Sequence, residues 1–367
     1  SNEWSKATEM YYPAELRKLQ EQWFHNAIIH YNKIQIEADG ISTVQGILLL
    51  NTLVNSRYTT DFSVNAMLMS SAVRHALDLG INRVDLVASV PPGEADLSRR
   101  VWWYCQIQDI DASYKTGKPP YIHHLDVSTL TEIDVDCPYS VGDDLHYNFD
   151  YVTRKSMDGG PHIYYCYAML ALTRIKYRSY YLLFSAKAQA TIGRLLDKTN
   201  QALRTINKMM YDFAAGLDPL VRPDHLDSTM YQLLTMPRTP ESQTDPTFHD
   251  LFIDHQDFLY EMKMTIQGAF YSHLMFVNRI PFAVYFPEQD LKEEFSILSY
   301  EASRAILRTL IDMDHNKLNK FTNMSLVNAG FLGMISLVFK HVTAHDSIGI
   351  QKDFDILSKV SMDVFSA

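Results

Sequence analysis

Clustered histidines and aspartates are the first place in this sequence where chemistry could occur. The segment HDLFIDHQD places five such side chains within about three helical turns: His249, Asp250, Asp254, His255 and Asp257. A His-Asp doublet with a distant His and Asp can hold the metal of a phosphohydrolase. Only the doublet is local here, and acidic residues near a helix start are more simply partners of the helix dipole. The sequence therefore favours a helix start over a metal centre.

Other catalytic patterns are weaker still. The pair His123-His124 falls in a segment expected to be a loop, and the aspartates at 143–144 lack the helical context of a DDxxD metal motif. A Gly-rich phosphate loop, a GxSxG elbow and an HExxH pair do not occur in the sequence. We therefore predict no catalytic residue, no metal and no cofactor in this chain, and a metal-dependent helical enzyme is the least favoured function.

Tyrosines are concentrated in one segment that is expected to be helical. Its members are Tyr164, Tyr165, Tyr167, Tyr177, Tyr180 and Tyr181. Each buried phenol hydroxyl needs a hydrogen-bond partner, so this number exceeds what a core usually needs. A pocket for a polar or aromatic effector would use them, although a half-exposed helix face explains them as well and is favoured. The candidate ligand-binding residues are Trp103, Tyr164, Tyr165, Tyr177 and Tyr181.

The elements that would position these side chains are helices. Hydrophobic residues make up 47% of the 367 residues, whereas Gly and Pro number only 14 each, and a chain this poor in turn residues makes long elements. No run shows the alternation of a strand. We predict an all-α fold, a large multi-helix bundle of about ten helices with no significant sheet. The helices are expected at about 14–38, 42–57, 61–80, 96–115, 163–184, 189–215, 248–278, 290–313, 323–345 and 351–365.

Residues 1–367 are expected to form a single helical domain, with a sub-boundary most plausible in the proline-rich segment 217–247. The net charge of −10 repels phosphate backbones, so the chain is not expected to clamp nucleic acid. Its longest apolar run, at 329–339, is too short to span a bilayer. The cysteines show no CxxC spacing and are expected to be reduced thiols of an intracellular protein. Because the chain begins with Ser1, it is expected to be a segment of something longer.

The segment 61–138 carries the most specific pattern in the chain. It contains SSAVRHALDLGINR, then SRRVWWYCQIQDIDASYKTGKPPYI, then EIDVDCP. This pattern resembles the regulatory middle homology region of fungal zinc-cluster transcription factors, also called the fungal-specific transcription factor domain. The matching positions are Arg74, Leu79, Gly80, Arg83, Arg99, Arg100, Trp102, Trp103, Asp109, Gly117, Lys118, Pro119, Ile133, Asp134, Val135, Asp136 and Pro138.

The resemblance implies a regulatory domain that senses a small-molecule effector and thereby controls transcription of target genes in the nucleus. The alternative is a helical scaffold that binds protein partners without a small molecule, as in a kinetochore relative of the family. Zinc and DNA contacts are expected only in a DNA-binding segment that this chain lacks, since it has three cysteines and the family's zinc cluster uses six. The other expected partners are transcriptional co-regulators and a second copy of the chain. No membrane contact is expected.

One ion pair can be predicted from helical spacing. Trp102, Cys105 and Asp109 share a face of the helix expected at 96–115, so the carboxylate lies beside the indole. Arg74 on a neighbouring helix could supply two charge-assisted hydrogen bonds, because guanidinium matches carboxylate geometry. We therefore predict a buried Arg74–Asp109 pair, a structural clasp that joins the two helices.

Overall fold

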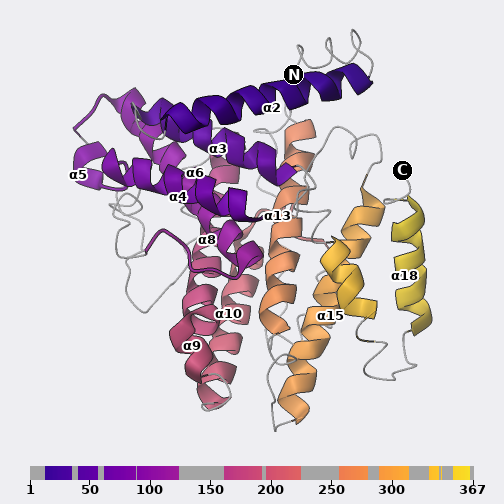
Figure 1. Ribbon diagram of the computed structural model, residues 1–367. Coiled ribbons are helices and arrows are strands. Elements are labelled where there is room, and N and C mark those ends of the chain that lie inside the picture. The colour runs from indigo at the N-terminus through magenta and orange to yellow at the C-terminus, as the bar shows by residue number, and fades with distance from the viewer. Residues whose placement is uncertain are drawn as a thin grey trace. The chain divides into compact units, whose positions relative to one another are not determined.

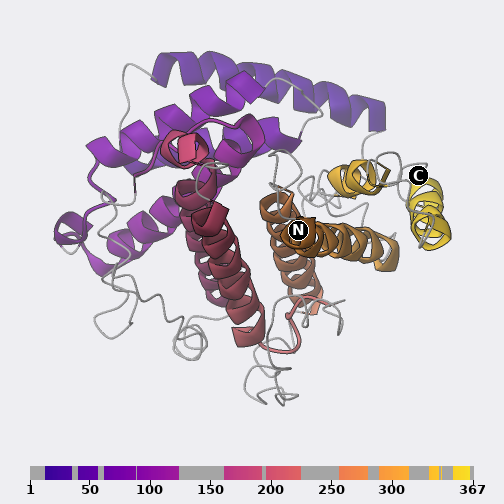
Figure 2. The ribbon, with the colours of Figure 1, turned by 90° about the horizontal axis from the view of Figure 1, so that it is seen from below.

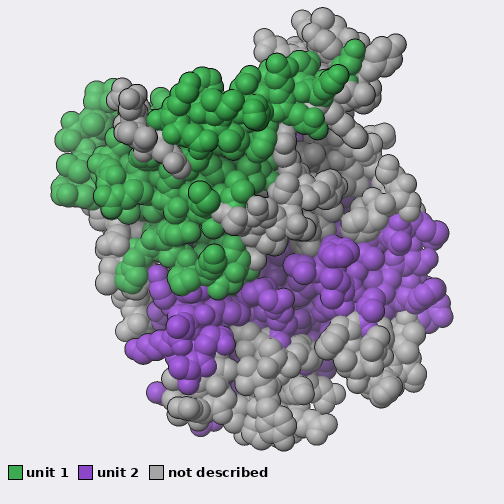
Figure 3. Space-filling model, viewed as in Figure 1, with its two compact units in different colours: residues 1–135 green, residues 136–367 purple. Residues whose placement is uncertain are grey.

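The computed structural model describes residues 13–34, 40–56, 62–87, 89–123, 161–191, 196–224, 256–279, 289–313, 330–338, 340 and 350–363. Within these ranges every regular element is a helix (Figure 1), so the all-α prediction is confirmed. The chain divides into two compact units, residues 1–135 and 136–367 (Figure 3). The predicted sub-boundary at 217–247 lies outside the described residues from 225 onward and stays a prediction. None of the described helices is long and apolar enough to cross a bilayer.

The first unit is a stack of helices: α2 (Pro13–Ile34), α3 (Gly40–Ser56), α4 (Phe62–Asp78), the short α5 (Val84–Val87) and α6 (Pro92–Thr116). Helix α3 packs against α2, α4 and α6, and α6 also packs against α4 and α5. Apolar residues spaced three and four apart place one stripe of each helix in the core. The fully buried side chains of this core include Val44, Leu68, Met69, Ala72, Ala76, Trp102 and Ile110.

Two glycines end α4 and α6 in the first unit. Gly80 has φ +71°, its N–H donates to the Leu77 carbonyl and the next N–H, that of Ile81, donates to the Ala76 carbonyl. These two bonds form a Schellman cap. Gly117 has φ +68° and its N–H donates to the Ser113 carbonyl at 2.9 Å. A side chain at either position would be strained, because L residues rarely adopt this conformation.

Two helix starts differ from the prediction. Helix α3 begins at Gly40, two residues before the expected start at 42. Helix α6 begins at Pro92, about a turn before the expected start at 96. Proline is well placed there, because its fixed φ suits the first helical position and its missing N–H has no intrahelical partner to lose.

The second unit is built around α13 (Gln256–Asn278). Helix α13 packs along α15 (Gln289–Asp312) and also contacts α8 (Pro161–Ser179) and α10 (Leu196–Gly216), as Figures 1 and 2 show. Helix α8 continues into a π-helical turn, η3 (Tyr180–Phe184), followed by α9 (Ala186–Thr191). Residues 330–338 are helical, and α18 (Ile350–Asp363) packs on α15. The helix predicted at 189–215 corresponds to the two helices α9 and α10, and the helices predicted at 248–278 and 323–345 are described only from 256 and over 330–338.

A buried ion pair joins α15 to α18. Arg304 donates from Nε to Asp353 Oδ1 at 2.5 Å and from a terminal nitrogen to Oδ2 at 2.7 Å, and it also contacts Glu301. The side chain of Asp353 is fully buried, and Lys340 lies 3.9 Å from its Oδ2. The fork of hydrogen bonds raises the pKa of Arg304, so the guanidinium stays charged. Sequence reasoning did not find this pair, because its partners are 49 residues apart.

We predict that Asp353→Asn destabilises the protein by about 3 kcal/mol or more, because it removes the fully buried carboxylate that accepts two hydrogen bonds from Arg304 and leaves only Glu301 to balance the guanidinium. Asp355→Asn is the matched control, since Asp355 lies on the same helix and is exposed, where it accepts a hydrogen bond from Gln351. The control should change stability by less than about 0.5 kcal/mol. Urea unfolding measures both, and equal effects would contradict the assignment.

Candidate functional site

The candidate tyrosines lie on α8 and η3, in the second unit. Tyr164 is buried, and its hydroxyl accepts a hydrogen bond from the backbone N–H of Asp218 at 3.2 Å. Burial raises the pKa of Tyr164, so its phenol stays protonated. Tyr164 therefore holds the start of α8 to the turn that follows α10. Trp103 belongs to the first unit, where both it and Trp102 are core residues.

The other candidate tyrosines form a half-buried face. Tyr165, Tyr177 and Tyr181 are each partly exposed. The ring of Tyr165 meets Phe258 of α13 edge-on, with centroids 6.2 Å apart, and the ring of Tyr181 meets Tyr180 edge-on at 5.7 Å. This arrangement fits the half-exposed helix face that the sequence favoured. A ligand contact at these tyrosines stays a prediction.

Helix α8 widens where these tyrosines end. The N–H of Ser185 donates to the carbonyl of Tyr180 at 2.8 Å, which is the five-residue spacing of a π-helical turn. The side-chain amide of Gln189 donates to the carbonyl of Leu183 at 2.5 Å and so satisfies a backbone group that the turn frees. Such turns are rare and occur often at functional sites. The turn was not predicted, because the sequence pattern read as one continuous helix.

Aromatic rings connect this turn to the end of α13. The rings of Phe184 and Phe276 lie 4.9 Å apart at an angle of 45°. The guanidinium of Arg279, which follows α13, stacks over Phe276 at 3.8 Å from the ring centroid. Sequence reasoning did not connect Phe184 with Phe276 and Arg279, because the two segments are about ninety residues apart and no spacing in the chain relates them.

A buried histidine joins α8 and α13. Ser179 Oγ lies 2.8 Å from the Ile175 carbonyl and 2.9 Å from His273 Nε2. Because a carbonyl only accepts, the single hydroxyl proton goes to Ile175, and Nε2 must donate its own proton to the serine. Desolvation, and then the positive charge of Lys176, lower the pKa of His273 well below its ordinary value. His273 is therefore neutral in the folded protein at physiological pH.

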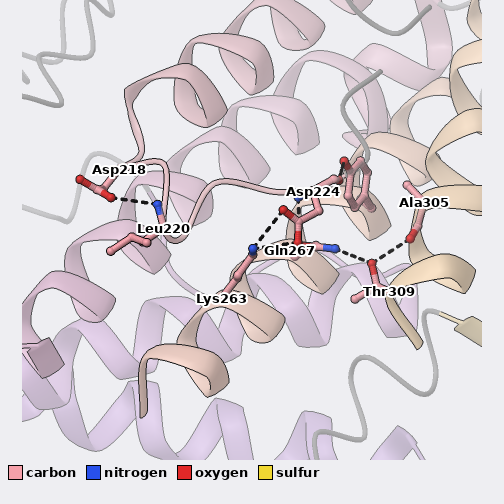
Figure 4. Close-up of polar contacts among 8 residues, drawn as sticks. Asp218, Leu220, Asp224, Lys263, Gln267, Ala305 and Thr309 are labelled. Carbon is pink, nitrogen blue, oxygen red and sulfur yellow. Dashed lines mark hydrogen bonds and ion pairs between the residues drawn. The ribbon is translucent and has the colours of Figure 1, made fainter. Parts of the chain in front are cut away.

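A buried glutamine joins α13 to two other elements (Figure 4). Gln267 Oε1 accepts from the backbone N–H of Asp224 at 3.1 Å, and its Nε2 donates to Thr309 Oγ1 of α15 at 2.6 Å. The Thr309 hydroxyl donates its own hydrogen bond to the Ala305 carbonyl at 2.8 Å. The hydroxyl proton is thus used in that bond, so the hydroxyl oxygen of Thr309 can act only as the acceptor for Gln267.

The same face of α13 makes three further polar contacts. Lys263 forms an ion pair with Asp224 at 2.8 Å, and the hydroxyl of Tyr271 donates to the Asp224 carbonyl. Asn278 and Asn207 of α10 exchange two amide hydrogen bonds, at 2.8 and 2.9 Å. Positions 263, 267, 271 and 278 share one side of a helix. Together they fix the position of α13 against α10, the turn at 217–224 and α15.

The predicted Arg74–Asp109 clasp is wrong. Arg74 pairs with Asp78 of its own helix at 3.0 Å, and its side chain is 74% exposed. Asp109 is fully buried, and its two carboxylate oxygens accept hydrogen bonds from the backbone N–H groups of Tyr121 and Ile122, each at 2.9 Å. The GKPP loop turns the chain back along α6, so backbone amides meet the carboxylate without the cost of burying a guanidinium.

The cysteines carry no sign of reactivity in the described residues. Cys105 is buried, and burial followed by the charge of Asp109 raises its pKa, which disfavours the thiolate. Cys166 is half-buried, and Cys137 lies outside the described residues. Among the described residues no group of three or more His, Cys, Asp and Glu could hold a metal ion. Four of the five residues singled out in HDLFIDHQD lie outside them, so the absence of a metal stays a prediction.

Residues 2–208 match the family model described as "Fungal specific transcription factor domain". The match covers the first unit and the helices of the second as far as α10, which is more than half of the chain. The chain belongs to this family. The resemblance seen in segment 61–138 is therefore confirmed, and Asp109 and Gly117 of that segment have structural roles.

Three curated proteins are similar to this fungal domain in sequence. Transcription factor TAC1 of Candida albicans is 23% identical over 95% of the chain and 37% of its own length. Halotolerance protein 9 of Saccharomyces cerevisiae is 31% identical over 32% of the chain and 11% of its own length. Aurofusarin cluster transcription factor aurR2 of Gibberella zeae is 37% identical over 18% of the chain and 10% of its own length. The chain spans well under half the length of these relatives. No solved structure matches it.

For this fungal domain we predict that Asp109→Asn destabilises the first unit by about 1–3 kcal/mol, because one backbone N–H would then face the amide NH2 group. Arg74→Ala should cost less than about 0.5 kcal/mol, since it removes an exposed pair within one helix. Chemical denaturation of the two variants compares them directly. A large loss of unfolding free energy in Arg74→Ala would contradict this assignment and support the Arg74–Asp109 pair.

We also predict a pH dependence from His273. Its pKa is lowered by folding, so the unfolded chain takes up the proton first, and the stabilisation present above about pH 6.5 is lost as the pH falls, by up to about 1.4 kcal/mol per pH unit. His273→Gln should flatten the fall of unfolding free energy between pH 7 and 5.5. His25→Gln, at an exposed position on α2, should leave that slope unchanged. Parallel slopes for wild type and His273→Gln would refute the assignment.

Proposed function

We propose that this chain is the effector-sensing regulatory domain of a fungal transcription factor, through which a small molecule controls transcription of target genes. The observation that supports an effector site is the aromatic face at the end of α8. Half-buried Tyr177 precedes the π-helical turn and half-buried Tyr181 lies within it, and that turn meets α13 through Phe184 and Phe276. Half-buried aromatic side chains suit the binding of an organic molecule.

The proposed switch is a shift between two packings of the second unit. Helix α13 contacts this aromatic face on one side and carries directional hydrogen bonds to α10 and α15 on another. Such bonds are either made or broken, so a displaced α13 would occupy a distinct arrangement and not a continuous range. An effector favours one arrangement only if it binds that arrangement more tightly.

The rest of the proposal concerns the longer protein. DNA would be contacted by a zinc cluster outside this chain, and zinc would belong to that segment alone. The factor would act in the nucleus, with transcriptional co-regulators as partners and a second copy of the chain as a further partner. The regulatory domain would restrain or expose an activation region according to the packing of its helices.

A second function, scaffolding of protein partners without a small molecule, is favoured by a different observation. Residues 330–338 form a helix whose inner side packs on α15, whereas its outer side exposes apolar side chains. These are Phe331, Leu332, Ile335 and Val338, with 45–56% of each exposed. Adjacent exposed apolar side chains often mark protein contacts.

Thermal unfolding against a panel of metabolites and xenobiotics tests the first function. A true effector at 100 times its Kd should add about 2.7 kcal/mol to the unfolding free energy. Tyr181→Ala should diminish the shift in the unfolding midpoint, and Tyr121→Ala, at an exposed position of the first unit, should not. If no compound shifts the midpoint and purified co-regulators bind, the scaffold function is supported instead.

A further inference from the structure

Two segments of the second unit carry basic residues but no acidic ones. The chain as a whole has a net charge of −10, yet neither 159–196 nor 262–287 contains a single Asp or Glu. The first stretch includes α8, η3 and α9, and the second includes most of α13. Their basic residues are Arg174, Lys176, Arg178, Lys187, Arg194, Lys263 and Arg279. Since α8 and α13 pack together, these two segments bring more basic than acidic residues into this part of the second unit.

Arg279 differs from the other basic residues of this region by what surrounds its guanidinium. The group stacks on Phe276 at 3.8 Å, and within the described part of the chain no carboxylate or carbonyl accepts a hydrogen bond from it. Lys263, by contrast, has Asp224 as its ion-pair partner. Burial of part of the side chain lowers the pKa of Arg279. The guanidinium still remains protonated, as it does throughout proteins. The residue is nevertheless exposed, so a ligand can reach it.

Among the side chains that the structure describes on α10 and α15, two acidic groups pair with other basic residues. On α10, Asp212 forms an ion pair with Lys208 at 2.7 Å, and on α15, Glu301 contacts Arg304. Asp197 is exposed near the start of α10. A stacked guanidinium keeps its edge free, and that edge can donate two parallel hydrogen bonds to a carboxylate. The rings of Phe184 and Phe276 contact each other and are partly exposed, so they offer apolar surface for the rest of a ligand.

We propose that Arg279, Phe276 and Phe184 form a binding site for an organic anion with a flat, aromatic body. Arg279 receives the carboxylate, and the aromatic rings contact the body. The inference rests on the proposed function, because it names the chemical class of the effector. It predicts that charge on the ligand contributes affinity that no neutral analogue of the same shape can replace.

Salicylate is the probe and salicylamide its neutral control, titrated into the whole chain by calorimetry or ligand-observed NMR. Wild type should bind salicylate saturably and salicylamide much more weakly. Arg279→Gln should weaken salicylate binding about tenfold or more, because it removes a charge-assisted pair of hydrogen bonds. Arg74→Gln makes the same change of net charge at an exposed site of the first unit and should bind as wild type does.

Three results overturn the anion site: no saturable binding of salicylate, equal affinity for salicylamide, or unchanged affinity in Arg279→Gln. If circular dichroism shows that Arg279→Gln does not fold, Arg279→Lys is used as the test variant. Lysine keeps the positive charge but cannot donate two parallel hydrogen bonds to a carboxylate. A several-fold loss in that variant supports the site, and unchanged affinity overturns it. If neutral compounds alone shift the unfolding midpoint in a Tyr181-dependent way, the proposed function stands and the anion class falls.

Discussion

The amide of Gln267 is the interaction on which the arrangement of the second unit depends. It is buried, so both of its ends need partners inside the protein. Its oxygen is satisfied only when the turn at Asp224 lies against α13, and its nitrogen only when Thr309 of α15 faces it. Any shift of α13 along either neighbour would break a bond that water does not replace. The helix is therefore held in one position by polar groups, whereas apolar packing alone would tolerate some sliding.

Helix α13 carries a different kind of contact on each side. Toward α10 and α15 it makes directional hydrogen bonds, and toward α8 it has a neutral histidine and an aromatic contact. The side that faces α8 also meets the basic, acid-poor segment that ends in η3. A molecule bound near Phe276 would act on the same helix whose opposite face fixes α10 and α15. This shared helix is the physical basis for linking ligand binding to a change in packing.

Asp109 and Asp353, whose side chains are fully buried, show how the chain satisfies charge in its interior. Asp109 is met by two backbone N–H groups twelve and thirteen residues later, whereas Asp353 is met by the guanidinium of Arg304. The first solution needs only a loop that turns back on its own helix. The second needs two separate helices and is the more costly to break, because loss of either partner leaves a buried charge. Buried charge thus fixes local geometry in the first unit and helix packing in the second.

The sequence by itself determined the helical character of the chain and the family, because periodicity and the segment 61–138 are local signals. Of the tyrosines that it singled out, Tyr165, Tyr177 and Tyr181 are half-buried, whereas Tyr164 and Tyr180 lie in the core. The partner of Asp109, the Arg304–Asp353 pair, the π-helical turn and the meeting of Phe184 with Phe276 were decided by the tertiary structure alone. Each depends on which segments come together in space, and for the long-range contacts no spacing in the chain encodes that. A carboxylate, moreover, accepts backbone amides as readily as a guanidinium, so residue type alone does not identify its partner.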